Sequence, residues 1–356
     1  IYEDKQGFLW LGTLGGGLSR YNQKTKTFKH FLHDPNNPAS ISHNNVWKIV
    51  EDKDHDLWIA TENGLSRYNR AKDRFVHYKH NSDDPDSIGS NTVRTVYVDN
   101  DNNIWAGTQL VGIDRYDRHQ NKFIHYKVVG PHNSVLHQDK SGTLWAANVH
   151  ALYQYDKKND LFQITYLDPE KQTQPIKGFF LAITEDTDDN LWIGTSSGLE
   201  KFDQKKNTMK YYGLDDGLND EAIAGLLFDK KGQLWISTAK GLSVLNPKDD
   251  SIRNYELGPY NRQANYMSKT GTLYFGGLNG LTHFSTDNIG DNPHIPNIVI
   301  TSYKKFNKEV QLEDSLTGLT NLNLTYKDRF FSFEFAALDF SDPKKNKYRY
   351  KLHGFD

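Results

Sequence analysis

The chain has 356 residues, with 36% hydrophobic, 13% aromatic and 25% charged side chains, and a formal net charge of −2. This near-neutral balance, without a stripe of lysine or arginine, argues against a nucleic-acid partner. The chain has no cysteine, which excludes disulfides and thiolate metal sites and is compatible with a secreted or periplasmic protein.

One motif recurs seven times, and its clearest copy is EDKDHDLWIATENGLSRYN at residues 51–69. Each copy contains an aromatic anchor, and successive anchors lie 39 to 48 residues apart. This period is typical of four-stranded propeller blades and longer than that of most helical or leucine-rich repeats. The anchors are Trp10, Trp58, Trp105, Trp145, Trp192, Trp235 and Tyr274.

The pattern inside a unit alternates with period two. Runs rich in Val, Ile, Trp, Tyr and Phe cover residues 46–52, 57–61, 64–69 and 74–80, and Asp, Asn or Gly bounds them. No window has the pattern of an amphipathic helix. Four strands per unit make a small meander sheet whose two faces can be buried only by neighbouring units. The sequence therefore predicts an all-β fold with a seven-bladed β-propeller.

The other signature residues have structural explanations. An Asp six residues before the anchor can accept hydrogen bonds from the backbone two residues on and start a hairpin. Three residues before the anchor, a Gly supplies the positive φ that this turn needs, or else His55, Asn102 or Asp189 stands there. We expect each anchor ring to fill the wedge between neighbouring blades. A small residue after it, such as Gly12 or Gly194, would allow close approach of the next blade.

Polar connectors at residues 33–45 and 81–92 carry turn signals and lead from one blade to the next. The seventh unit has a weak first strand and little that resembles a fourth, so we expect chain from elsewhere to complete it. The first residues read as the end of a strand, and no signal peptide or membrane span is recognisable. We interpret the chain as a piece of a longer protein.

The repeats stop at Phe284, and alternating runs without the anchor follow a connector that contains Pro293 and Pro296. We assign residues 1–292 to the propeller and residues 293–356 to the N-terminal part of an Ig-like β-sandwich, which has too few strands to be complete.

The repeating unit resembles the two-component regulator propeller repeat, and residues 331–356 resemble the opening of the triple-tyrosine Ig-like domain that follows such propellers. The resemblance implies the periplasmic sensor region of a single-pass bacterial receptor, followed by a membrane helix. The output domain would be a histidine kinase, often of the hybrid type, or a diguanylate cyclase. It further implies sensing of a small polar ligand, such as an oligosaccharide, and a homodimer of the full-length receptor.

Propeller geometry places a ligand over one end of the central channel, where aromatic faces can stack on sugars and guanidinium groups can pair with carboxylates or sulfates. The connectors that enter the first strands supply Trp47, Arg94, His132, Phe179, Glu221 and Arg262. The loops after the second strands supply Glu62, Gln109, His150 and Lys240.

We expect neither a metal nor another cofactor, and no motif indicates catalysis. Acidic triplets such as Asp52, Asp54 and Asp56 resemble half of a calcium loop but lack its central Gly and bidentate Glu, so solvated hairpin carboxylates explain them better. Two alternatives to a sensor remain: a protein-interaction scaffold without a small ligand, and a propeller lyase or glycosidase. An enzyme would need converging acid and base residues at the channel mouth.

Overall fold

The structure is a computed structural model that describes residues 1–109, 111–128, 135–148, 151–166, 178–289, 297–310, 324–325, 329–337 and 350–351. The chain divides into two compact units, Ile1–Asn288 and Ile289–Asp356. Within the described ranges the only helices are short 3₁₀ turns, at Arg70–Lys72, Leu214–Asp216 and Thr286–Asn288. None of the helices in these ranges is long and apolar enough to cross a bilayer.

The first unit is built from antiparallel sheets that follow one another along the chain, six with four strands and one with three. The first sheet contains β1 (Tyr2–Glu3), β2 (Phe8–Gly12), β3 (Leu18–Asn22) and β4 (Thr27–Phe31). The second contains β5 (Val46–Glu51), β6 (Leu57–Thr61), β7 (Gly64–Asn69) and β8 (Arg74–Tyr78). The third contains β9 (Val93–Val98), β10 (Ile104–Thr108), β11 (Ile113–Asp117) and β12 (Lys122–Tyr126). The next two are β13 (Val135–Gln138), β14 (Leu144–Ala147), β15 (Leu152–Asp156) and β16 (Leu161–Tyr166); and β17 (Phe180–Glu185), β18 (Leu191–Thr195), β19 (Gly198–Asp203) and β20 (Thr208–Tyr212). The last two are β21 (Ile223–Phe228), β22 (Leu234–Thr238), β23 (Gly241–Asn246) and β24 (Ser251–Tyr255); and β25 (Tyr260–Met267), β26 (Thr272–Gly277) and β27 (Gly280–Ser285).

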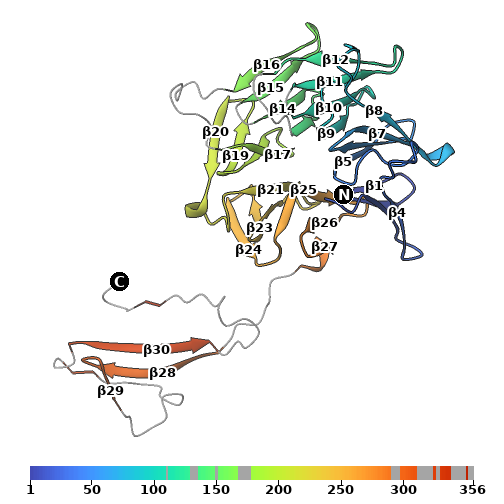
Figure 1. The fold of residues 1–356 in the computed structure, drawn as a ribbon. Coiled ribbons are helices and arrows are strands. Elements are labelled where there is room, and N and C mark those ends of the chain that lie inside the picture. The colour runs from blue at the N-terminus through green and yellow to red at the C-terminus, as the bar shows by residue number, and fades with distance from the viewer. Residues whose placement is uncertain are drawn as a thin grey trace. The chain divides into compact units, whose positions relative to one another are not determined.

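These sheets are the blades of a β-propeller, and the first strand of each blade lies nearest the centre (Figure 1). The ring closes between the seventh blade and the first. There the rings of Tyr2 and Tyr266 lie 5.6 Å apart, and the Tyr266 hydroxyl donates to the Glu3 carbonyl at 3.3 Å. The seventh sheet has three strands in the described residues, so completion of this blade by chain from elsewhere stays a prediction.

The anchor rings fill the wedges between blades, as predicted. Trp10, which is fully buried, stacks on Phe31 of its own blade with a centroid distance of 5.6 Å and packs against Tyr68 of the next at 5.5 Å. The Asp six residues earlier fixes the ring, because the Trp10 indole Nε1 donates to Asp4 Oδ2 at 2.7 Å. The same bond occurs for Trp58, Trp105, Trp145, Trp192 and Trp235 at 2.7 to 2.9 Å.

The hairpin turns also follow the prediction. Gly7 has φ +83°, and the residues that replace Gly, His55, Asn102 and Asp189, have φ between +66° and +69°. Gly12 contacts the next blade so closely that a Cβ atom there would lie 2.5 Å from Val46 Cγ1. The small residue after the anchor is therefore required by the spacing of the blades.

The two long connectors fold back onto the blade that follows them. Ile41 and Ile88 enter the core and are fully buried. The His33 ring Nδ1 is 2.8 Å from the Ile41 carbonyl, and His80 makes the matching contact with Ile88 at 2.9 Å. Much of each connector is therefore fixed scaffold.

The second unit contains, in its described part, the sheet β29–β28–β30, formed by β28 (Ile298–Lys305), β29 (Lys308–Glu309) and β30 (Phe331–Ala337). Tyr303 is 1% exposed, and its ring stacks on Phe333. Most of residues 331–356, which resemble the opening of the Ig-like domain, lie outside the described residues, so the Ig-like sandwich remains a proposal.

Candidate functional site at the channel mouth

Register shifts in the first strands direct side chains toward the end of the channel where the connectors enter. In β5 the ladder pairs Val46 with Thr61 and Lys48 with Ala60, so Trp47 is the extra residue of a bulge. Arg94 occupies the same place in β9. A bulge bends its strand and redirects the side chain at that position. The two bulges therefore bring the side chains of Trp47 and Arg94 together.

Four of the predicted residues form one contact network, which we call the mouth cluster: Trp47, Glu62, Arg94 and Gln109. The Trp47 indole Nε1 donates to Glu62 Oε2 at 3.0 Å, and Arg94 Nη1 donates to the same oxygen at 3.3 Å. Arg94 Nη2 donates to Gln109 Oε1 at 2.7 Å. The guanidinium carbon lies 4.1 Å from the centre of the Trp47 ring. Two blades thus share one polar and aromatic surface.

The mouth cluster is partly open to solvent, since the side chains of Arg94 and Glu62 are 22% and 31% exposed. In this ligand-free arrangement the charge of Arg94 is compensated by Glu62, and one face of the Trp47 ring is covered by the guanidinium. A ligand that binds here must exchange some of these contacts for its own. Hydroxyl groups suit this exchange, because each can donate to Glu62 and accept from Arg94.

The remaining predicted site residues are not joined to this cluster by any contact among the described residues. Phe179 is 51% exposed and lies just before β17. Glu221 accepts a bond from the Gly198 amide through its carbonyl oxygen, and Lys240 and Arg262 are exposed. Two further predicted residues, His132 and His150, lie outside the described residues.

The bulges explain why the first strands of the fifth and sixth blades contribute few polar or aromatic side chains to the candidate site. There the bulged residues are Leu181 and Ala224, each 5% exposed, rather than Phe179 and Glu221. The sequence prediction chose Phe179 two positions and Glu221 three positions too early, because the bulge adds a residue that simple alternation does not register.

Lys48, one residue after Trp47, was missed. Its side chain is half-buried in β5, and desolvation lowers the pKa of its ammonium group. The signal was present in the sequence, because Lys48 is a charged residue inside a strand that is otherwise apolar at its core positions.

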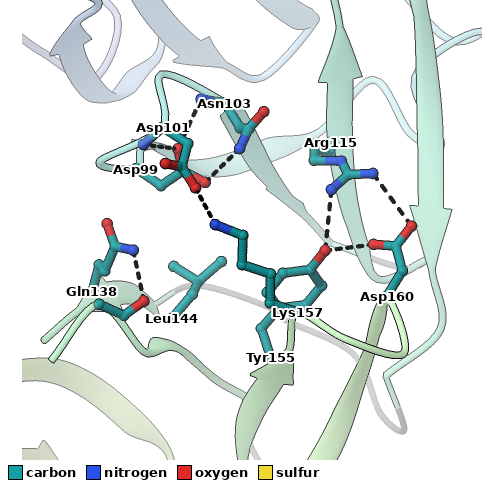
Figure 2. Close-up of a pocket in the computed structure, with 10 residues that line it drawn as sticks. Asp99, Asp101, Asn103, Arg115, Gln138, Leu144, Tyr155, Lys157 and Asp160 are labelled. Atoms are coloured by element: carbon teal, nitrogen blue, oxygen red, sulfur yellow. Dashed lines mark hydrogen bonds and ion pairs between the residues drawn. The ribbon is translucent and has the colours of Figure 1, made fainter.

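A hollow of about 350 Å³ lies between the third and fourth blades, at the hairpins that join their first and second strands (Figure 2). Its charged groups are paired with one another. Lys157 Nζ is 2.6 Å from Asp101 Oδ2, and Arg115 bonds to Asp160 at 3.3 Å and to the Tyr155 hydroxyl at 3.1 Å. No group of this lining is left uncompensated in a way that would call for a ligand.

The acidic triplets are not simply solvated, which corrects the sequence interpretation. The first carboxylate of each, at Asp52, Asp99 and Asp186, is 1 to 8% exposed and accepts bonds from the turn amides and the anchor indole. The turn needs these carboxylates, because the backbone amides and the anchor indole would otherwise be buried without hydrogen-bond acceptors. No cluster of three or more metal-ligating side chains occurs in the described part of the chain.

Comparison with known proteins agrees with this architecture. Residues 40–63, 87–109 and 175–197 match the family described as two component regulator propeller. The histidine kinase P4 of Formosa agariphila is 25% identical over 361 residues, which cover 99% of this chain but only 21% of that protein.

Two solved structures share the fold. The extracellular domain of a hybrid two-component system of B. thetaiotaomicron has a TM-score of 0.65 at 22% identity, covering 94% of this chain and 47% of that one. A virginiamycin B lyase from Staphylococcus aureus has a TM-score of 0.60 at 16% identity, covering 80% and 92%. The chain thus spans 21% of that histidine kinase and 47% of that hybrid two-component domain. Three stretches of the chain thus match the two-component regulator propeller repeat, and its sheets form a β-propeller.

Proposed function

We propose that this chain is part of the extracytoplasmic sensor region of a bacterial two-component receptor and binds a carbohydrate or other small polar ligand at the mouth cluster. The repeats support this proposal, as do the relatives, one named a histidine kinase and another an extracellular domain of a hybrid two-component system. The whole receptor's output domain, either a histidine kinase or a diguanylate cyclase, remains part of the proposal.

The observation that carries the proposal is the composition of the mouth cluster. An indole ring, a guanidinium, a carboxylate and an amide meet within hydrogen-bond distance at one end of the channel, on two neighbouring blades. Aromatic faces and planar polar groups recognise the apolar faces and the hydroxyls of sugars. The network joins Glu62, in the loop after the second strand of one blade, to Arg94 on the first strand of the next blade.

The second unit would pass the signal toward the membrane, and we propose that it does so as a homodimer in the full receptor. In the first alternative, the propeller is a protein-interaction scaffold that binds no small ligand. The lyase alternative rests only on a shared fold, and no observation in the described residues favours it.

A calorimetric and thermal-shift screen of neutral and acidic oligosaccharides tests the proposal, because a ligand that binds only the folded state raises its Tm. We expect at least one ligand to raise the Tm of the wild type, and to raise it less in Trp47→Ala and in Gln109→Ala. The matched control Arg74→Ala, which changes an exposed residue of the outer strand β8, should keep the full Tm shift. Binding that survives both cluster variants would place the site elsewhere. The absence of any ligand would favour the scaffold.

A further inference from the structure

The seventh blade ends in β27, and no strand pairs with the outer edge of β27 among the described residues. In the six other blades a fourth strand covers this edge and places an aromatic residue opposite an aliphatic residue near the start of the third strand. These pairs are Leu18–Phe31, Leu65–Tyr78, Ile113–Tyr126, Leu152–Tyr166, Leu199–Tyr212 and Leu242–Tyr255. All six aliphatic members are fully buried, whereas Leu281, which holds this place in β27, is partly exposed.

Gly280, just before Leu281, borders an open space where the other blades have a fourth strand. At Gly64 an added Cβ would lie 2.6 Å from the carbonyl oxygen of Tyr78. Gly280 also has a positive φ, +114°, but an added Cβ there would meet no atom within 4 Å among the described residues. The backbone of β27 is therefore shaped as in a complete blade, while the place of the fourth-strand carbonyl is open.

Two aromatic rings of the first blade are also more exposed than their counterparts. In the second blade, Tyr68 and Phe75 pack against Phe31, from the fourth strand of the preceding blade, with centroid distances of 5.4 and 5.6 Å. Both are buried, at 2% and 5% exposure. The corresponding pair of the first blade is Tyr21, which is partly exposed, and Phe28, which is 54% exposed. One aromatic side chain on a fourth strand of the seventh blade would cover both rings.

The connectors indicate which part of the polypeptide would supply this strand. The connector into β5 covers β8, because its Ala39 carbonyl accepts the Phe75 amide at 3.0 Å. The connector into β9 covers β12 in the same way, through Asp86 and the Phe123 amide at 2.8 Å. No described residue makes this backbone bond to the Phe28 amide, and β4 has no buried residue. A connector into β1 would cover β4, and the strand before that connector would cover β27.

We propose that the outer edge of β27 binds a fourth strand from the stretch of the same polypeptide that leads into β1, with an aromatic residue opposite Leu281. Antiparallel pairing would supply hydrogen-bond partners to the backbone of this edge. The aromatic ring would lie between Tyr274 and Tyr21, in the place that Phe31 has between the first and second blades. This inference concerns the closure of the propeller and does not depend on a ligand at the mouth cluster.

The test adds such a strand to the full chain. Tyr2 and Tyr97 each pair with the anchor of their own blade, so the residue that precedes Tyr97 corresponds to Ile1. A copy of residues 71–95, which contain β8 and the connector into β9, is therefore fused directly before Ile1. We expect the fusion to melt several degrees above the unfused chain, because a linked strand binds the folded state at a high effective concentration.

Variants of the fusion test whether the strand occupies the proposed place, and each is measured against the unfused chain with the same β27 sequence. Tyr78→Ser in the added copy should lose most of the Tm gain, because it removes the ring opposite Leu281. Leu281→Asp should lose it as well. The matched control Leu278→Asp, at a residue 78% exposed in the hairpin before β27, should keep the gain. Hydrogen exchange at the Phe28 amide should slow about tenfold in the fusion, because the connector supplies its acceptor.

The proposal is overturned if the fusion melts no higher than the unfused chain, or if the gain survives both Tyr78→Ser and Leu281→Asp. A dimer of the unfused chain in analytical ultracentrifugation that Leu281→Asp dissociates would assign the edge to a second copy, and would also overturn the proposal.

Discussion

The buried aspartate of the second blade offers the sharpest test of how the propeller is held together. Asp52 is 1% exposed, and its Oδ1 atom accepts the backbone amides of Asp54 and Asp56 at 2.9 and 3.0 Å. Its Oδ2 atom accepts the Trp58 indole at 2.7 Å and Arg118 Nη2, from the next blade, at 2.9 Å. One carboxylate thus organises a turn, an anchor ring and a blade junction.

We predict that Asp52→Ala lowers the free energy of unfolding by about 3–5 kcal/mol, the usual cost of removing one partner from a buried ion pair. Each buried donor left without an acceptor contributes about 1–3 kcal/mol to this loss, and the contributions overlap. Asp52→Asn should cost less, because its carbonyl oxygen can still accept the two turn amides. Urea unfolding followed by tryptophan fluorescence measures these differences.

Asp54→Ala is the matched control, because Asp54 pairs with the same arginine at 2.9 Å but its side chain is 66% exposed. An exposed ion pair contributes at most about 1 kcal/mol. The reasoning is refuted if Asp52→Ala costs no more than Asp54→Ala, since the burial of the carboxylate would then be irrelevant to stability.

Two further predictions concern blade spacing and pH. At Gly194 an added Cβ would lie 2.5 Å from Ile223 Cγ2, so Gly194→Ala should cost about 1–3 kcal/mol in urea unfolding, whereas a neutral effect would contradict the tight blade junction. The Asp114 carboxylate, 2.7 Å from the ring of His125, raises the pKa of this histidine to about 9. Because the folded-state pKa is raised, its stabilising contribution is complete below about pH 6.5 and is lost as the pH rises through 9. Asp114→Ser should remove this pH dependence, and an NMR titration that finds His125 near its ordinary pKa in the wild type would contradict the assignment.

Much of the propeller was predictable because its determinants are local and repeated. The Asp, the turn residue and the anchor lie within seven positions, so their bonds can be anticipated from a single copy. The positive φ of His55, +66°, was predicted from its position in the motif, although histidine is an unusual residue for this turn. The indole bond to Asp4 was not predicted, although the constant separation of six residues was a signal for it.

The site was predictable only in part, because its geometry depends on contacts between blades. Arg94 meets Glu62 from 32 positions away, and nothing in either local pattern specifies this pairing. The bulge decided which residues turn toward the channel, and its extra residue is invisible when only apolar alternation is read. Trp47 was predicted because it is an aromatic residue where a connector enters a first strand.

The hollow in Figure 2 can be traced to a single change in how the buried aspartate is satisfied. At the junction between the second and third blades, Arg118 supplies the second donor to the indole-binding oxygen of Asp52. In the next junction Asn103 Nδ2 donates to Asp99 Oδ2 from within the same turn, at 2.8 Å. The residue that corresponds to Arg118 can then be a lysine, Lys157, which pairs with Asp101 instead.

A short internal donor therefore replaces a long arginine that would fill the notch between the blades. The fifth blade follows the same rule, because Asn190 donates to Asp186 Oδ2 at 2.8 Å. The hollow is thus a consequence of which residue completes the buried carboxylate, and its polar groups are already satisfied. The mouth cluster differs in composition, because it adds the face of an aromatic ring, Trp47, to the partly exposed charges of Arg94 and Glu62. This difference is the physical reason for which we propose ligand binding at the mouth rather than in the hollow.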